Sequence, residues 1–126
     1  PSGNGISEFE VVDGVIPFPG WDSFDDAEVF DLDESTRDHA AAHIGTIAAR
    51  IPTDPLMLSD DRRHRVPVTL LMGGTTEDEF RVQVKEWGAW GDEFEAIDDS
   101  EVVKLGSGHW PQFSQPDVLA QAILTL

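Results

Sequence analysis

A histidine on a glycine-flanked loop is the residue in this sequence best suited to acid–base chemistry. His109 lies in the stretch 106–111, Gly-Ser-Gly-His-Trp-Pro, between an expected strand and an expected helix. Glycines allow a tight turn that presents one imidazole at the end of a strand. Because histidine side chains titrate near about pH 6.5, such a group can take up and return a proton near neutral pH. The alternative is a histidine that only packs against or caps its loop.

Three carboxylates follow expected strands. Asp13 ends an apolar stretch over residues 8–13, and Glu77 and Asp78 come shortly after the apolar run 66–72. In parallel sheets, catalytic groups gather just past the carboxyl ends of strands. The competing interpretations are a loop-capping role for Asp13 and, for Glu77 and Asp78, favourable charge at a helix start.

The elements that must position these residues alternate between strands and helices, which predicts an α/β fold with parallel strands. The run Val-Pro-Val-Thr-Leu-Leu-Met ending at Gly73-Gly74 is typical of a buried parallel strand. Thr75 or Thr76 can cap the helix that follows. We expect a flexible lead-in over residues 1–7 and one α/β domain over residues 8–126. The expected strands of this domain are 8–13, 66–72 and 101–105. The expected helices are 35–50, a segment after Thr76, and 114–124.

Composition excludes several functional classes. The 126 residues hold 25 Asp and Glu against 8 Lys and Arg, a formal net charge of −17. Such a charge repels nucleic-acid phosphates and anionic lipids, so we expect neither partner. No apolar run reaches the roughly 20 residues that cross a bilayer, and no secretory signal opens the sequence, so we expect a cytoplasmic protein. The absence of cysteine excludes disulfides and thiolate chemistry.

Three stretches resemble α/β-hydrolase-fold esterases, especially bacterial ones. Residues 108–119, Gly-His-Trp-Pro-Gln-Phe-Ser-Gln-Pro-Asp-Val-Leu, closely resemble the segment that carries the catalytic histidine in that family. Residues 11–17 look like the end of the sixth strand, and residues 54–63 before 66–69 look like a cap exit and seventh strand. The resemblance spans about residues 9–126. It implies the C-terminal part of a hydrolase-like parallel sheet with flanking helices and a partial cap, residues 14–65.

The resemblance further implies a catalytic triad acting on a carboxylic ester or similar small substrate, without a cofactor. His109 would be the general base. Asp13 is the first choice for the acid, because a minority of the family, including one subtype of haloalkane dehalogenases, places it after the sixth strand; Asp78 or Glu77 is the second. Trp110, and with it Trp21, are the candidates for binding the substrate.

The nucleophile departs from the family pattern. Gly-x-Ser-x-Gly occurs nowhere in the 126 residues. We therefore expect this chain to supply the histidine and to be inactive alone. The half that carries the nucleophile is deleted, removed by proteolysis, or supplied by another polypeptide. The strand 66–72 should expose an edge, which favours pairing with that polypeptide or a homo-oligomer. The alternatives are a non-catalytic small α/β protein for binding or assembly, and a dehalogenase-like hydrolase.

Other clusters have plainer interpretations. His39 and His43 have the i, i+4 spacing of a metal pair, but no third ligand is evident, so no metal is expected. We expect Trp87 and Trp90 to pack in the core or against a helix; the alternative is that they line an apolar substrate pocket. The arginines at 62, 63 and 65 should pair with local carboxylates.

Overall fold

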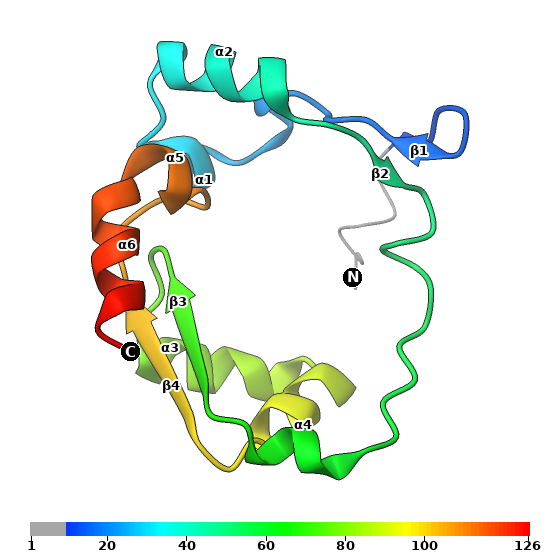
Figure 1. Cartoon of the computed structure of the whole chain (residues 1–126), viewed down its shortest axis with the longest axis vertical. Helices are drawn as coiled ribbons and strands as arrows, with labels where there is room; N and C mark the ends of the chain where they lie inside the picture. The colour runs from blue at the N-terminus through cyan, green and yellow to red at the C-terminus, as the bar shows by residue number, and fades with distance from the viewer. Residues whose placement is uncertain (1–9) are drawn as a thin grey trace. The chain divides into compact units, whose positions relative to one another are not determined.

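A computed structural model describes residues 10–126 of the chain. The chain forms two compact units, Pro1–Met57 and Leu58–Leu126. Figure 1 labels their helices and strands. The expected lead-in, residues 1–7, and the first two residues of the expected strand 8–13 lie outside the described residues.

The described part of the first unit begins with a tight hairpin instead of the expected strand. Asp13 and Gly14 have φ of 50° and 81°, and Val12 and Val15 exchange two backbone hydrogen bonds around them, N···O 2.8 and 3.0 Å. Asp-Gly is a preferred pair for a two-residue turn because both residues tolerate positive φ. Strand β1, Val15–Ile16, follows and pairs antiparallel with β2, Ile47–Ala48. Asp13 therefore lies in a turn before β1, and not at the end of a strand.

Three short helical segments complete the first unit: η1 (Trp21–Ser23), α1 (Asp26–Val29) and α2 (Glu34–His43). The carboxylate of Asp33 accepts a hydrogen bond from the Thr36 N–H and begins α2. The predicted helix 35–50 ends at His43, since Ile44 is extended and Gly45 follows it. Arg37 ties α2 to α1 by donating to the carbonyl oxygen of Val29 at 2.8 Å.

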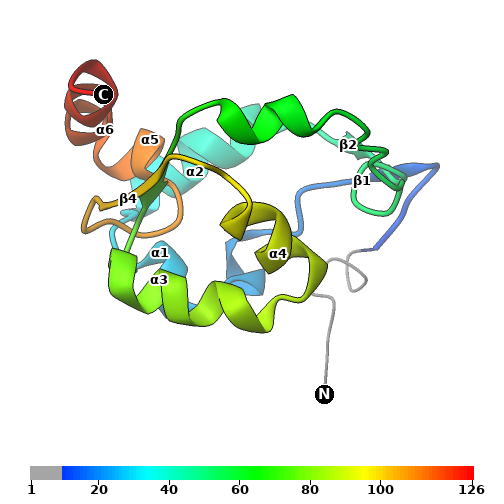
Figure 2. The ribbon, with the colours of Figure 1, turned by 90° about the horizontal axis from the view of Figure 1, so that it is seen from below.

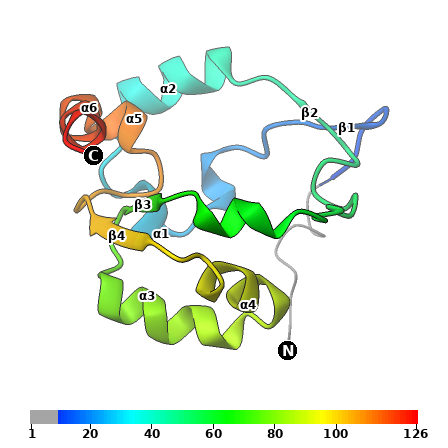
Figure 3. The same cartoon turned by 60° about the horizontal axis from the view of Figure 1, so that its bottom comes forward.

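A parallel strand pair forms the centre of the second unit. Strand β3, Val68–Met72, lies beside β4, Ser100–Lys104, with Leu70 opposite Val102. Both were predicted from the sequence within two residues. Figures 2 and 3 show that α3, Glu77–Gln83, and α4, Ala89–Glu95, lie on one side of this pair.

The helices of the second unit begin where the sequence provides caps. Thr76 and Glu79 form a capping box: the threonine hydroxyl accepts from the Glu79 N–H, and the glutamate accepts from the Thr76 N–H. Proline opens α5, Pro111–Ser114, and α6, Pro116–Leu124. The remaining segments are the 3₁₀ turns η2 (Asp61–Arg65) and η3 (Val84–Glu86). Phe80, Val84 and Val102 form the buried core, with Leu70, Met72 and Phe94 packed against it.

The fold is mixed α/β, as the sequence predicts. The described residues hold two two-stranded sheets, of which one is parallel, and residues 10–13, the described part of the expected strand 8–13, do not form a third parallel strand. Two strands are fewer than a hydrolase-like sheet requires. Within residues 10–126, no helix has the length and apolar character needed to cross a membrane.

Candidate functional site

The loop that carries His109 is fastened to the carboxyl end of β3. The carbonyl oxygen of Gly73 accepts hydrogen bonds from the N–H groups of Gly106 at 2.7 Å and Ser107 at 3.1 Å. Gly106 has a φ of 75°, which glycine adopts without strain. Ser107 is only 3% exposed, and its hydroxyl donates to the carbonyl oxygen of Gly108 at 2.9 Å. The histidine loop thus has a fixed backbone path at one end of the parallel pair.

Gly73 is required at this contact because it leaves room for the loop. A Cβ atom at position 73 would lie 2.6 Å from the carbonyl oxygens of both Ser107 and Gly108. Backbone atoms cannot give way at that distance without moving the loop. Gly74, the next residue, has open space around its equivalent position. The first glycine of the pair therefore sets the position of the histidine loop.

His109 is exposed and lies against Trp110, as their adjacency suggests. The two ring centroids are 4.7 Å apart in an edge-to-face arrangement. Trp110 directly precedes α5, and Gln115 after that helix donates back to the carbonyl oxygen of Gly106 at 3.2 Å. An accessible imidazole with an indole beside it can exchange protons with a bound molecule and offer that molecule an apolar contact.

The two acids after β3 share the second unit with His109. The Glu77 carboxylate is engaged with Arg81, whose guanidinium also donates to the carbonyl oxygen of Ser100 at 2.9 Å. Asp78 is exposed in the first turn of α3 and, in the described part of the chain, has no hydrogen bond or ion pair through its side chain. Of these two carboxylates, that of Asp78 is the more available to accept a hydrogen bond from another group, because that of Glu77 is already paired with Arg81.

The other two candidates, Asp13 and Trp21, belong to the first unit. Asp13 is exposed in the hairpin turn. Trp21 packs edge-on against Phe18, with ring centroids 4.9 Å apart, and its indole N–H donates to the carbonyl oxygen of Arg37 at 2.9 Å. Trp21 therefore has a structural task in its own unit. The roles of Asp13 and Trp21 at a catalytic site stay predictions.

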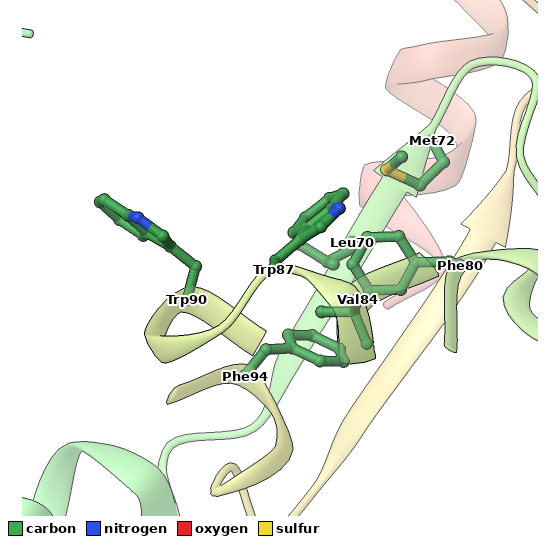
Figure 4. Close-up of a pocket in the computed structure, with 7 residues that line it drawn as sticks. All are labelled: Leu70, Met72, Phe80, Val84, Trp87, Trp90 and Phe94. Carbon is green, nitrogen blue, oxygen red and sulfur yellow. The ribbon is translucent and has the colours of Figure 1, made fainter. Parts of the chain in front are cut away.

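The second unit contains an apolar hollow, whose lining includes Trp87 and Trp90. It has a volume of about 510 Å³, and each of its lining residues is apolar: Leu70, Met72, Phe80, Val84, Trp87, Trp90 and Phe94. Trp87 packs edge-on against Phe80, yet it is 50% exposed, and Trp90 is 74% exposed. Figure 4 shows Trp90 standing apart from the other six side chains. The expected helix packing holds for Trp87, whereas Trp90 lies at the surface.

The stripe of Phe80, Val84 and Trp87 was the sequence signal for this hollow. Their spacing of four and then three residues places them on one helical face. The sequence could not show that β3, β4 and α4 leave part of this apolar helical face uncovered.

A charge cluster links η2 to α4. The guanidinium of Arg63 donates twice to the carboxylate of Glu93, at 2.6 and 2.9 Å, and Nε2 of His64 lies 3.0 Å from the same carboxylate. Hydrogen bonding to Arg63, with a smaller contribution from His64, lowers the pKa of Glu93 from 4.5 to about 2. The prediction that arginines pair locally is confirmed for Arg62, which pairs with Asp60, and for Arg63, whose guanidinium also donates to the Asp61 carboxylate at 3.2 Å.

The two histidines of α2 face each other. Their ring centroids are 4.5 Å apart, and Nδ1 of His43 donates to the carbonyl oxygen of His39 at 2.7 Å. Across residues 10–126, no group of three or more histidine and carboxylate side chains could hold a metal ion.

Comparisons with known proteins place this chain in no family: no family model, no curated protein and no solved structure matches it.

Proposed function

We propose that this chain supplies the catalytic histidine of an α/β-hydrolase-like enzyme that cleaves a carboxylic ester or similar small substrate. The supporting observation is the His109 loop, which Gly73 holds at the carboxyl end of a parallel strand pair with the imidazole exposed. Catalytic groups of parallel α/β folds gather at that end of the strands. In this proposal, the pair β3–β4 is the C-terminal part of a larger sheet, and residues 14–65 form a partial cap.

His109 would act as a general base and then as a general acid. It takes the proton from a nucleophilic hydroxyl as that oxygen attacks the ester carbonyl, and it returns the proton to the departing alkoxide. In the second half-reaction, it takes a proton from water, and the released hydroxyl of the nucleophile receives that proton as the acid product leaves. The 126 residues contain no Gly-x-Ser-x-Gly, so the proposal requires a nucleophile from outside them, such as one on a second polypeptide.

Asp13 is the first candidate for the acid that orients the imidazole, and Asp78 is the second. The exposed carboxylate of Asp78 and its place after β3 support the second candidate, because Glu77 is already paired with Arg81. Trp110 is the first candidate for contacting the substrate, since its ring lies beside His109.

The first test is the mass of the protein isolated from its source, measured under native and then denaturing conditions. We expect a second polypeptide that accompanies the 13.9 kDa chain natively and separates on denaturation. The assembled protein should hydrolyse p-nitrophenyl acetate, and His109→Ala should lower the rate by about 10²–10⁴-fold. His39→Ala is the matched control, because His39 is also exposed but lies on α2.

A single 13.9 kDa species without ester hydrolysis would contradict the proposal. The alternative is then a non-catalytic binding or assembly protein, which the open apolar hollow supports. Release of halide from a haloalkane, without ester cleavage, would instead assign the assembled protein to dehalogenase-like chemistry.

A further inference from the structure

One edge of β3 has backbone groups that point away from its only partner strand in the described structure. The Val68 N–H donates to the carbonyl oxygen of Asp99 at 3.0 Å, and the carbonyl oxygen of Met72 accepts from Leu105 at 2.7 Å. In a parallel ladder, alternate residues bond to the same neighbour. The N–H and C=O groups of Thr69 and Leu71 therefore face the opposite edge, where no strand of residues 10–126 pairs with β3.

The apolar hollow borders this open edge. Successive side chains of a strand point to opposite faces, and Leu70 and Met72 line the hollow together with residues of α3, η3 and α4. A molecule that reaches the hollow across β3 thus meets two kinds of groups. It meets main-chain donors and acceptors that no strand of residues 10–126 pairs, and an apolar wall that includes Trp87 and Trp90.

An extended polypeptide can bind both the main-chain groups at the edge of β3 and the apolar wall of the hollow. Its backbone can continue the ladder at Thr69 and Leu71, and its alternate side chains can enter the hollow. A small ligand is too short to pair with the backbone groups of both Thr69 and Leu71. The hollow also has no polar side chain that would fix a small ligand in one orientation, because every lining residue is apolar. Strand addition therefore fits the surface better than binding of a small molecule.

Charge argues against a second copy of this chain as the occupant. The segment 85–99, which carries α4 and one wall of the hollow, contains six acidic residues and one lysine. A second copy would bring another −17 to the contact. A strand flanked by lysine or arginine would be attracted instead.

We propose that the edge of β3 binds a partner's extended strand that is apolar at alternate positions and carries basic residues at its ends. The strand pairs with Thr69 and Leu71, and its apolar side chains fill the hollow between β3 and α4. This inference goes beyond the hydrolase proposal and does not depend on catalysis by His109.

The test uses the full chain and the probe peptide Lys-Lys-Val-Thr-Val-Thr-Val-Lys-Lys. We expect saturable binding accompanied by a blue shift of tryptophan fluorescence, because Trp87 and Trp90 lose contact with water. A peptide with the same side chains but N-methylated at alternate residues cannot complete the ladder. It should bind at least about tenfold more weakly, as expected when about 1.4 kcal/mol of interaction is lost.

Two variants locate the binding surface on the protein. Leu71→Pro places a ring at the open edge and removes an N–H that the ladder to β4 does not use, so it should abolish binding. Trp90→Ala removes an exposed side chain that the fold does not need, and it should weaken binding at least about fivefold. Leu124→Ala is the matched control, since Leu124 is comparably exposed on α6, and it should bind as the parent does.

Each alternative has a distinct outcome that overturns the proposal. Equal binding of the parent and N-methylated peptides would show apolar contact without strand pairing. Binding of toluene at the hollow without binding of either peptide would identify a small-molecule site. A dimer in sedimentation that protects Trp87 and Trp90 would identify a second copy as the occupant. Unchanged tryptophan fluorescence with every probe would show that the edge of β3 binds no extended peptide of this kind, which would also contradict the proposal.

Discussion

At the scale of single residues, the Glu93 carboxylate contacts two side chains from another element, η2. It joins α4 to Arg63 and His64, which precede β3 and lie about thirty positions earlier in the sequence. Bidentate arginine–carboxylate pairs fix geometry as well as charge. This pair therefore holds the start of β3 against the helix that forms one wall of the hollow.

Glu93→Gln should lower the melting temperature at neutral pH. Arg63 holds the folded pKa of Glu93 at about 2, below its ordinary value of 4.5, so the ionised carboxylate stabilises the folded state above pH 4.5. That contribution is lost as the pH falls from 4.5 through about 2, where the folded carboxylate becomes protonated. Thermal unfolding followed by circular dichroism at several pH values should show the two proteins converging as the solution is acidified.

Glu95→Gln is the control for this comparison. Glu95 is exposed at the end of the same helix and, in the described part of the chain, forms no ion pair. The substitution Glu95→Gln removes the same charge as Glu93→Gln, and the melting temperature of this variant should be close to that of the parent protein. Equal destabilisation by both variants would show that helix charge, and not the contact with Arg63, is responsible.

At the scale of elements, the close approach of β3 to the histidine loop depends on Gly73. Gly73→Ala places a methyl group 2.6 Å from two backbone carbonyl oxygens. The loop must then shift, which should cost about 1–3 kcal/mol of unfolding free energy. Gly74→Ala has open space and should be neutral or slightly stabilising. Urea unfolding of both variants measures the difference, and equal stability would contradict the close approach.

The sequence predicts the elements whose signals are local. The apolar run before Gly73 predicts β3, and the spacing of Thr76 and Glu79 predicts the start of α3, because strand burial and helix capping act between neighbouring residues. The Asp13-Gly14 pair is also a local turn signal. The apolar residues before it favoured a strand instead, and the two-residue strands β1 and β2 are too short to show a period.

The contacts that define the surfaces could not be predicted in the same way. The pairing of Arg63 with Glu93 joins positions 30 apart, so it follows only from the path of the chain. The hollow likewise combines residues of β3, α3, η3 and α4. His109 could be selected because glycine-flanked loops are visible in sequence. The role of Gly73 in holding that loop depends on a contact across 35 positions, which no spacing rule encodes.

At the scale of the whole molecule, negative charge is distributed unevenly. Residues 1–57 carry 12 acidic residues and 2 arginines, while residues 58–126 carry 13 acidic residues and 6 basic ones. Seven of the acids lie within residues 22–34. With so few cations nearby, repulsion among these carboxylates opposes the folded state of the first unit.

Added salt should therefore raise the melting temperature by several degrees. Going from about 0.01 M to about 1 M NaCl shortens the Debye length from about 30 Å to about 3 Å, which screens repulsion between exposed carboxylates. The double substitution Asp22→Asn, Asp38→Asn removes two exposed charges from the first unit and should melt higher than the parent in low salt, with a smaller response to NaCl. Calorimetry of both proteins across the salt series measures this. An equal response in both would assign the effect to salt acting on apolar burial, because that contribution does not depend on the number of carboxylates.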